Sequence, residues 1–529
     1  MHPFLQARQG RSNRLKLLFG LLGAITLSVL LVTSQQVVLK MLPFDNKSEF
    51  QVVVDLPEGS TLEQTQGVLN QVSQALLTLP EVTHLQTYAG TAAPMNFNGL
   101  VRQYFLRQQP WQGDVQVNLQ DRHQRDEQSH AIALRVRPLL SKLEKSTGAS
   151  IKLVEVPPGP PVMAPLVAEV YGPDYQAQLK AATALQQQFA ATPLLVDIDS
   201  TVEAPQPRWQ LIADQQKAAL LGVSVEAINQ TLQMAVSGHT ATFLRDDHKR
   251  QLTPVELQLG EGVLANWTAL GQLPVVSQTG QLIALSELTR KVETTRENTI
   301  YRKDLRPVVF VTADLAGGPD SPLYGMLDVK AALSQQPAAP TQQLFSVPTD
   351  TDQISIKWDG EWQITFETFR DMGIAYGVGL IMIYLLVVAQ FKSYGVPLMI
   401  MAPIPLTIIG IMPGHWLLGV QFTATSMIGM IALAGIIVRN SILLVDAIQQ
   451  QTSAGVDLEQ AVVHASALRA RPIILTALAA MLGAMFILDD PIFGGLAVAL
   501  IAGLGVSTAL TLVVIPVVYY AYHYQRSAS

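Results

Sequence analysis

One arginine lies in the middle of an apolar stretch, at Arg439 in GIIVRNSILLVDAI (residues 435–448). An ionisable side chain inside a bilayer costs at least ~2.5–3.5 kcal/mol on insertion scales, so such groups usually face a protein interior and have a partner. Asn440 and Ser441 add polarity that anchoring a helix at the membrane surface does not require. The alternative is an arginine that extends its side chain to the surface, since Asp446 is only about 10 Å further along the helix. We favour the functional interpretation.

A second polar pair lies in ALRARPIILTALAAMLG (residues 467–483). Arg469 and Thr476 are seven residues apart and therefore lie on one face of a helix. Taken alone, Arg469 is typical of a cationic anchor at the cytoplasmic end of a span. Thr476 alone is typical of a threonine that is hydrogen-bonded to its own helix backbone. These two residues therefore do not by themselves indicate chemistry.

Other polar residues of this region have ordinary explanations. His415 is near the outer end of an apolar run beside Trp416, and we predict an interfacial residue rather than a ligand. Asp489 and Asp490 are placed where the chain would turn between two runs, and we predict a solvated turn. The sequence has no HExxH, GxSxG, phosphate-binding loop or paired-cysteine motif, so it does not indicate an enzyme.

The elements that would hold these residues are membrane helices. Of the 529 residues, 49% are hydrophobic and only 14% are charged, which is too apolar for an ordinary soluble protein. A helix needs about 20 apolar residues to cross a bilayer, and six such runs occur, at residues 15–32, 372–389, 396–418, 425–445, 472–488 and 492–519. Six glycines in these runs would let helices approach closely: Gly373, Gly377, Gly494, Gly495, Gly503 and Gly505. Between their ends the runs contain no Asp or Glu, so either Arg439 stays solvated or a carboxylate from another polypeptide pairs with it.

The first run is interpreted as a membrane anchor, with a cleaved signal peptide as the alternative. Arg8, Arg11, Arg14 and Lys16 accompany it, and VTS at residues 32–34 resembles a cleavage site. Its apolar core of about 17 residues is longer than the 7–15 typical of signal peptides. The basic cluster places the N-terminus in the cytoplasm, and an even number of spans returns the C-terminus there. The polar region between the first two runs then lies outside, in the periplasm of a bacterium.

This outer region reads as repeated strand–helix–strand units. The predicted strands are FQVVVDLP (50–57) and THLQTYAG (83–90) around a helix at 61–79, DVQVNLQD (114–121) and SIKLVEVP (150–157) around a helix at 127–147, and LVAEVYG (166–172) and LLVDIDS (194–200) around a helix at 174–191. A strand-and-hairpin-like insertion interrupts the third unit, and the pattern then resumes and ends at ISIKWDG (354–360). The predicted fold class is a membrane α-helical bundle of six transmembrane helices with a large periplasmic α+β region of repeated βαβ subdomains.

Composition also bears on possible ligands. The chain contains no cysteine, so disulfides and thiolate metal sites are excluded. The net charge of −6 is modest, and no basic stripe or helix–groove motif indicates nucleic-acid binding. We expect neither a metal site nor a cofactor.

Several stretches together resemble the C-terminal half of a resistance–nodulation–division (RND) efflux permease. They are MLPFDNKSEFQVVVDLPEGSTLEQT (41–65), AQFKSYGVPLMIMAPIPLTIIGI (389–411), GIIVRNSILLVDAI (435–448) and LRARPIILTALAAMLGAMF (468–486). The similarity runs along nearly the whole chain in the right order and spacing. In that family a full chain has twelve spans in two similar halves, and this sequence matches one half only. We therefore expect a split or half-length transporter.

The resemblance implies a role for each segment. Residues 1–14 would be a cytoplasmic N-terminus, 15–36 the first transmembrane helix, 37–156 one periplasmic porter subdomain, 157–206 with 298–360 the second, 207–297 an inserted docking subdomain, and 361–529 transmembrane helices two to six with a cytoplasmic segment near 447–471. In the family these parts work as a trimer driven by proton flow, with a periplasmic adaptor protein and an outer-membrane channel. The chain would then be a multi-pass protein of the bacterial inner membrane with both termini in the cytoplasm.

The family's proton relay falls on Arg439, Arg469 and Thr476. Drug pumps usually have a lysine where this chain has Arg439, whereas an arginine holds its proton more firmly and forms a planar fork. The acidic residues of the relay belong to the N-terminal half of the family's chains. The resemblance thus implies that a complementary N-terminal half-permease supplies the carboxylates.

The stretch TAAPMNFNGLV (91–101) resembles the family's flexible loop between two drug pockets. The aromatic positions of that loop fall on Met95 and Phe97, and both residues suit a pliable apolar site for amphiphilic organic compounds. An ordinary packed loop is the alternative. For the whole chain the alternatives are a non-transporting scaffold or regulatory half-permease, an inactive truncated relic, and, less favoured, an exporter of metal ions, lipids or proteins.

Overall fold

The structure is a computed structural model, and it describes residues 2–5, 9–157, 159, 161–246, 249–264, 266–336 and 339–528. Arg8 of the basic cluster lies outside the described residues. The chain divides into two compact units, one made of residues 1–202 and 300–529 and the other of Glu203–Thr299. Each unit has its own hydrophobic core.

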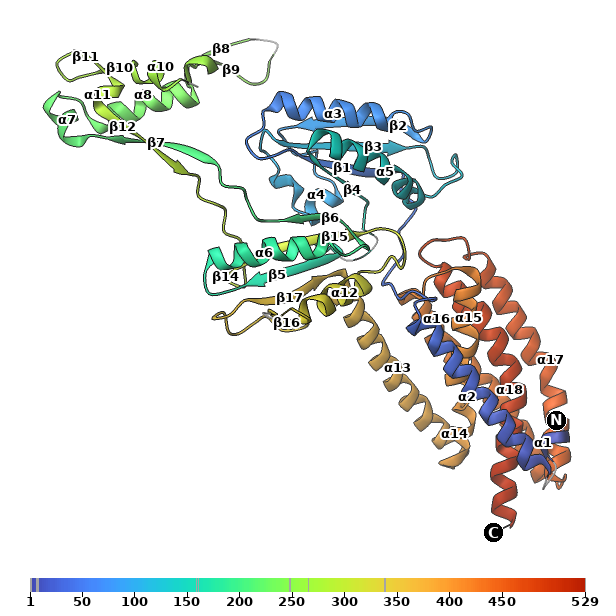
Figure 1. Ribbon diagram of the computed structural model, residues 1–529. Helices are drawn as coiled ribbons and strands as arrows, with labels where there is room; N and C mark the ends of the chain where they lie inside the picture. The colour runs from blue at the N-terminus through green and yellow to red at the C-terminus, as the bar shows by residue number, and fades with distance from the viewer. Residues whose placement is uncertain are drawn as a thin grey trace. The chain divides into compact units, whose positions relative to one another are not determined.

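Long apolar helices form the membrane part of the first unit (Figure 1). After the short α1 (His2–Leu5), they are α2 (Gln9–Thr33), α13 (Glu361–Phe391), α14 (Gly395–Met401) continued by the 3₁₀ turn Pro405–Thr407 and α15 (Ile408–Leu418), α16 (Ala424–Ser453), α17 (Leu458–Met485) and α18 (Gly494–Ala528). By length and composition they give six candidate spans in the described residues, so the predicted six-helix membrane fold is confirmed. The third span is broken where Pro403 and Pro405 lack the N–H that a continuous helix needs. Near 447–471, where a cytoplasmic segment is predicted, only residues 454–457 interrupt the helices.

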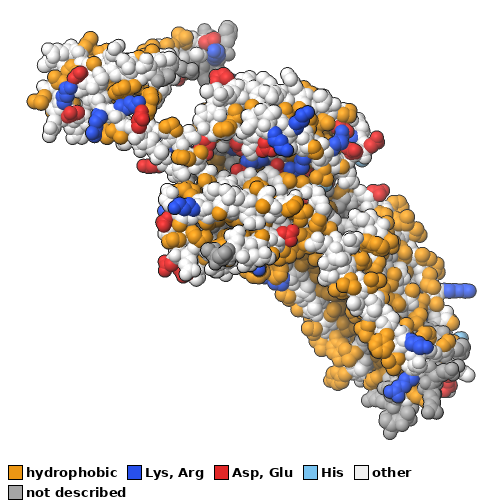
Figure 2. Space-filling model, viewed as in Figure 1, with side chains coloured by type: hydrophobic (Ala, Val, Ile, Leu, Met, Phe, Trp, Pro, Cys, Tyr) orange, Lys and Arg blue, Asp and Glu red, His pale blue; other side chains and the backbone are white. Residues whose placement is uncertain are grey.

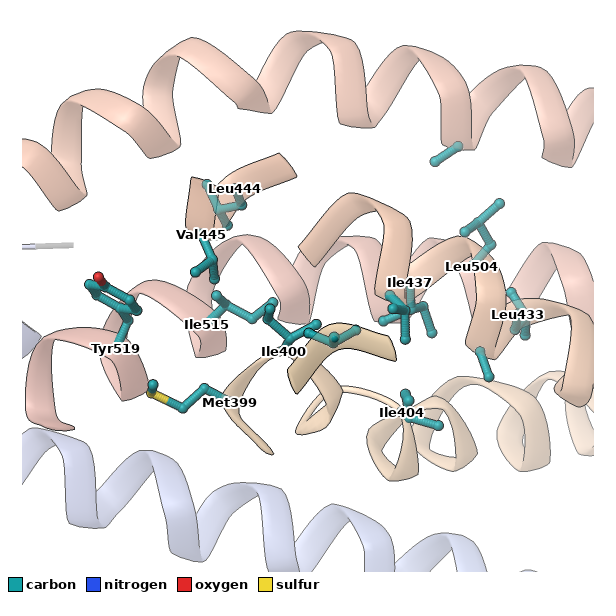
Figure 3. Close-up of a cluster of buried hydrophobic side chains, with 14 of the residues drawn as sticks. Met399, Ile400, Ile404, Leu433, Ile437, Leu444, Val445, Leu504, Ile515 and Tyr519 are labelled. Atoms are coloured by element: carbon teal, nitrogen blue, oxygen red, sulfur yellow. The ribbon is translucent and has the colours of Figure 1, made fainter. Parts of the chain in front are cut away.

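Burial within the bundle is uneven. Figure 2 shows hydrophobic side chains covering the surface of the helices, whereas most charged side chains lie over the α/β part. The exposed hydrophobic residues include Leu18 of α2, Leu386 of α13 and Leu475 of α17, as expected for helices that face lipid. The central packing is provided by α16 and α18 (Figure 3), where Leu433 and Ile437 of α16 lie in one buried cluster with α18 side chains.

Two α/β subdomains lie outside the bundle in the chain order expected. The first α/β subdomain contains β1 (Glu49–Asp55), α3 (Leu62–Leu76), β2 (Val82–Ala89), β3 (Gln112–Leu119), α5 (Ser129–Thr147) and β4 (Ser150–Val154). Its sheet has the order β2-β3-β1-β4, and β1 pairs antiparallel with both β3 and β4. One face of the sheet is covered by α3 and α5, whose Leu69, Val72 and Ile132 are buried against it.

The second α/β subdomain repeats this topology. It contains β5 (Leu166–Tyr171), α6 (Tyr175–Ala190), β6 (Leu195–Ser200), β15 (Val309–Leu315), α12 (Pro322–Ser334), β16 (Thr341–Gln343) and β17 (Ser355–Gly360). The short strands β13 (Arg302–Lys303) and β14 (Arg306–Pro307) directly precede β15. Its order β6-β15-β5-β17, with β16 added at the edge, matches β2-β3-β1-β4 strand for strand. The repeated βαβ units are therefore present as split βαβ pairs, in which a strand of one unit separates the two strands of the other.

The inserted unit (Glu203–Thr299) interrupts the second subdomain between β6 and β15. It contains β7 (Pro207–Ala213), α7 (Gln215–Leu220), α8 (Val225–Ser237), β8 (His239–Leu244), β9 (Thr253–Leu257), α9 (Glu261–Leu264), α10 (Trp267–Gly271), β10 (Pro274–Val276), β11 (Leu282–Ala284), α11 (Leu285–Leu288) and β12 (Thr289–Thr295). The first and last strands of the unit, β7 and β12, pair antiparallel with each other. The strand-and-hairpin interpretation is wrong for α8, whose N-cap Ser224 accepts a hydrogen bond from Ala227 N–H and whose Ile228 and Ala235 are buried.

Candidate functional site

Arg439 lies on an uncovered face of α16. Its side chain is exposed, and so are the residues one turn away on either side. These exposed positions follow one face of the helix: Ile428, Ala432, Gly435, Arg439 and Leu443. Within the part of the chain that the structure describes, Arg439 has no hydrogen bond or ion pair. The opposite face of α16 is buried, as Leu433, Ile437 and Leu444 show in Figure 3.

The polar neighbours of Arg439 point into the bundle instead. Asn440 and Ser441 are buried, and Ser441 Oγ donates to Ile437 O at 2.7 Å. Asp446 accepts a hydrogen bond from Gln450 Nε2 at 2.8 Å. Asn440 and Ser441 therefore do not share the face on which Arg439 lies.

Arg469 and Thr476 lie on α17. Thr476 is exposed, and its Oγ1 donates to Pro472 O at 3.0 Å and to Ile473 O at 2.9 Å. Arg469 is half-buried, and its Nε has no hydrogen-bond partner among the described residues. No hydrogen bond in the described part of the chain joins Arg439, Arg469 and Thr476, so the relay remains a prediction from the family resemblance.

A buried polar cluster lies at the N-terminus of α16. Thr423 caps α16 by accepting from Ser426 N–H, and Ser426 Oγ accepts from Thr423 N–H at 3.1 Å. His415 of α15 is fully buried, with Nε2 at 2.9 Å from Ser426 Oγ and Nδ1 at 2.9 Å from Ile411 O. The interfacial prediction for His415 is therefore wrong, because the start of the next helix supplies a polar partner that converts an exposed position into a buried one.

The loop between β2 and β3 presents apolar side chains to solvent. It contains α4 (Phe97–Val101) and the 3₁₀ turn Tyr104–Leu106. Met95 is 66% exposed and Phe97 is 45% exposed. Asn96 caps α4 by accepting from Gly99 N–H at 2.7 Å, so the helix is held although its apolar side chains are uncovered. The packed-loop alternative is not supported for these two side chains.

Both ends of this loop are held by Asp114 of β3. Its Oδ2 accepts from Ala93 N–H at 3.1 Å, and its Oδ1 accepts from Arg107 Nε at 3.1 Å. Arg107 also pairs with Asp55 at 2.8 Å and donates to Val54 O. Burial raises the pKa of Asp114, and this effect outweighs the opposite effect of the Arg107 guanidinium. The loop therefore has fixed ends and an exposed apolar middle.

Ion pairs join the first and second α/β subdomains around a cavity of about 210 Å³. The pairs are Arg102–Asp314 at 3.1 Å, Arg137–Asp197 at 2.5 Å and Lys152–Asp199. Burial raises the pKa of Asp197 to about 6, although its partner Arg137 opposes the rise. This interface was not predicted, because the acidic residues of the outer region look scattered along strands and loops. The alternation in LVDIDS, which places Asp197 and Asp199 two residues apart on one strand, is the signal that could have found it.

Asp489 and Asp490 lie between α17 and α18, as predicted for a turn. Asp490 Oδ1 accepts from Ile492 N–H at 2.9 Å and from Phe493 N–H at 2.8 Å. Among the described residues, no group of three or more His, Asp or Glu side chains has the spacing to hold a metal ion.

Comparison with known proteins gives a consistent family. The model of the AcrB/AcrD/AcrF family matches residues 11–523. The swarming motility protein SwrC of Bacillus subtilis is 28% identical over 332 residues, which cover 61% of this chain and 30% of SwrC. The multidrug resistance protein MdtC of Escherichia coli is 26% identical over 417 residues, which cover 77% of this chain and 39% of MdtC.

A solved structure shares the fold. The crystal structure of a heavy metal efflux pump matches with a TM-score of 0.80 and 21% identity, covering 98% of this chain and 51% of the pump chain. The chain thus spans about half of that structure and less than half of SwrC and MdtC. The family model matches nearly the whole chain, and the six spans and two α/β subdomains agree with it. The chain therefore belongs to the AcrB/AcrD/AcrF family of RND permeases.

Proposed function

We propose that this chain is a half-length subunit of an RND efflux pump driven by the proton-motive force. In this proposal it exports amphiphilic organic compounds from the periplasm or from the inner-membrane leaflet. A complementary N-terminal half-permease supplies the acidic residues of the proton relay. The observation that carries the proposal is the exposed Arg439 in the middle of α16, which forms no hydrogen bond or ion pair with any described residue.

The face of α16 around Arg439 suits a second helix. Gly435 lies one turn and Ala432 two turns from Arg439 on the exposed face, and residues this small let helix backbones approach closely. A partner helix packed there would bring its carboxylates to the guanidinium in a water-poor environment, where a charge-assisted hydrogen bond is strong. Both the charge of Arg439 and the small residues beside it on this face thus favour a protein partner over lipid.

Arginine stays protonated in proteins, so the proton would be carried by the partner's carboxylates. Protonation of these acids would release Arg439, and the helix packing would shift between two arrangements of different proton affinity. Arg469 and Thr476 would assist from α17 once the partner helix is in place. The half-buried Arg469 has hydrogen-bonding capacity left for this role, because its Nε has no partner among the residues that the structure describes.

The remaining parts of the proposal follow the family. Arg11, Arg14 and Lys16 precede the apolar part of α2, which favours an inner-membrane orientation with both termini in the cytoplasm. The α/β subdomains would then be periplasmic porter subdomains, and the inserted unit would be a docking subdomain in a trimer with an adaptor protein and an outer-membrane channel. The exposed Met95 and Phe97 favour amphiphilic organic substrates, because both side chains offer adaptable apolar contact area.

An affinity pull-down of the tagged chain from native membranes tests the partnership. We expect recovery of a second half-permease with intramembrane aspartates. In cells that contain both chains, Arg439→Met is expected to abolish efflux of a fluorescent amphiphilic dye, and Arg439→Lys to retain part of it. Arg471→Met, at an exposed arginine in the middle of α17, is the control and is expected to leave efflux unchanged. If the chain is recovered alone and Arg439→Met pumps normally, a scaffold or an inactive protein is the better account.

A further inference from the structure

A short segment between α2 and β1, residues 38–41, is bound to the residues that begin α16. Leu39 forms a parallel β-bridge with Phe422. Phe422 N–H donates to Val38 O at 2.9 Å, Lys40 N–H donates to Phe422 O at 3.2 Å, and Ala424 N–H donates to Met41 O at 3.0 Å. We call residues 38–41 the tether. Its backbone is fixed to the N-cap region of the helix that carries Arg439.

The same tether binds the second α/β subdomain. Lys40 Nζ lies 2.6 Å from Asp320 Oδ2, and the lysine side chain is only 2% exposed. Leu39 N–H donates to Tyr324 Oη at 3.3 Å. Asp320 lies two residues before the start of α12, next to its N-cap Ser321, and Tyr324 is in the first turn of the helix. A four-residue segment therefore contacts both α16 and α12.

The first α/β subdomain completes this joint. Lys40 Nζ lies 4.1 Å from the centre of the Phe44 ring, and Phe44 stacks on His130 of α5 with ring centres 4.4 Å apart. His130 Nδ1 is 2.8 Å from Glu155, and its Nε2 is 3.6 Å from Asp320. Lys40 thus contacts the Asp320 carboxylate and the face of the Phe44 ring, and both of these groups also contact His130.

The chemistry of Lys40 suggests a purpose beyond anchoring. Burying a charged pair costs desolvation that well-packed apolar side chains would avoid, so stability alone does not call for a lysine here. An ion pair does fix geometry, because Lys40 and Asp320 keep the tether and the start of α12 in one relative position when either of them moves. Helix α13 already continues directly from β17 at Gly360, so it moves with the second subdomain. Helix α16 has no such direct continuation and reaches that subdomain through the tether.

We propose that Lys40 and Asp320 are a positioning pair that passes displacement of α16 to the second α/β subdomain. This inference rests on the proposed function, in which release of Arg439 moves α16. The tether follows the start of α16 through its backbone hydrogen bonds, and the ion pair moves the start of α12 with it. Access to the cavity between the two α/β subdomains would then change with the state of Arg439.

Hydrogen–deuterium exchange on the purified full chain tests the connection without any transport assay. The readout is deuterium uptake in peptides that cover residues 318–326. The start of α16 is loosened by Thr423→Ala, or by Ser426→Ala, which removes the other half of the same reciprocal cap. With the native pair, we expect loosening to raise uptake by about threefold or more, as contacting residues couple by such amounts. In the double variant Lys40→Met/Asp320→Leu, which removes both charges and keeps the bulk, we expect the rise to disappear.

The matched control is Lys47→Met. Lys47 pairs with Asp45 near the tether at 2.8 Å but is half exposed, and among the described residues no ion pair joins it to α12. This variant should transmit the loosening as the native chain does. An equal rise with and without the Lys40–Asp320 pair, or no rise in the native chain, would overturn the inference.

Efflux measurements separate this inference from the proposed function. In cells where the native chain and its partner export the dye, the double variant is expected to export about tenfold less while dye binding changes less than twofold. The single variant Lys40→Arg, which keeps a cation opposite Asp320, should retain most of the export. If the native chain shows no export, the proposed function fails, and the exchange measurement still decides whether the pair transmits motion. If the native chain and the double variant export equally, the inference is wrong although the proposed function stands.

Discussion

Arg102 of the first α/β subdomain and Asp314 of the second form a two-pronged ion pair. Nη1 lies 3.1 Å from Oδ2 and Nη2 lies 3.3 Å from Oδ1, and both side chains are 9% exposed. Arg102 is the C-cap residue of α4, the helix that begins at Phe97. The exposed apolar loop of one subdomain is therefore fixed to a strand of the other.

Arg102→Ala is expected to lower the free energy of unfolding by about 3–5 kcal/mol, because it leaves Asp314 buried without a partner. The thermal midpoint of the detergent-solubilised chain measures this loss. The double variant Arg102→Met/Asp314→Leu is expected to recover most of it, since no unpaired charge remains. Arg135→Ala, at an arginine 42% exposed that pairs with Glu81, is the control and should cost about 0–1 kcal/mol. Equal losses at Arg102 and Arg135 would contradict the buried-pair account.

Asp197 gives stability a pH dependence. Burial raises its pKa to about 6, so the folded chain binds the proton more tightly than the unfolded chain does. Stability should then fall as pH rises from about 4 to 6 and level off above, by up to about 3 kcal/mol for this group. We expect Asp197→Asn to remove that fall in thermal midpoints measured from pH 4.5 to 7.5.

The control for Asp197 is the exposed Asp126→Asn, which removes one carboxylate without removing a buried one. Its pH profile should follow that of the native chain. A profile of Asp197→Asn that also follows the native chain would show that another group titrates in this window.

Elements dominated by burial were predictable from the sequence. The pattern of FQVVVDLP predicts a strand, and β1 is found at Glu49–Asp55, although its residues 50–54 are all buried rather than every second one. The apolar runs predict spans because lipid accepts few other sequences. The strand order was not predictable in this way, since β1 pairs with residues 112–119 and 150–154 and no local pattern encodes that pairing.

The polar contacts between distant segments were also beyond local patterns. Lys40 is one lysine in a connecting segment, and only the fold brings Asp320 to it. His415 was judged by its position in the span, whereas its partner Ser426 comes from the next helix. Arg439 was predictable because its signal is local, a charge inside an apolar run.

The membrane helices contain some glycines that are packed closely against another helix and some that are not. A Cβ at Gly410 would lie 2.4 Å from Ala502 O, a backbone atom that cannot move aside. A Cβ at Gly377 would meet nothing within 4 Å in the described structure, so no other described segment of this chain packs closely against this glycine. By contrast, a Cβ at Gly503 would lie 2.5 Å from Leu433 Cδ1, as predicted for a close helix contact.

Gly410→Ala is therefore expected to separate α15 from α18 and to lower the free energy of unfolding by about 1–3 kcal/mol, as overpacking does. Gly377→Ala is the matched control, and it should be neutral or stabilising because alanine favours helix. Thermal midpoints and yields of membrane-inserted protein measure both. A Gly410→Ala chain as stable as Gly377→Ala would mean that these helices are free to move apart.

Phe97 and Met95 should affect ligand binding without affecting folding. Because both side chains are largely exposed, Phe97→Ala is expected to change the free energy of unfolding by less than about 0.5 kcal/mol. Loss of one aromatic contact, worth about 0.5–1.5 kcal/mol, should weaken binding of a fluorescent amphiphilic dye by roughly 2–13-fold. Fluorescence anisotropy on the purified chain measures the affinity.

Leu282→Ala is the control for Phe97, because it removes a comparably apolar side chain, 69% exposed, from the inserted unit. We expect this variant to bind the dye as the native chain does. Asn96→Ala tests whether the position of α4 matters for dye binding. This variant removes the cap of the helix but leaves the Phe97 side chain unchanged. If Phe97→Ala binds normally while Asn96→Ala does not, the loop acts through its backbone rather than through its apolar side chains, and the substrate class must be inferred from other residues.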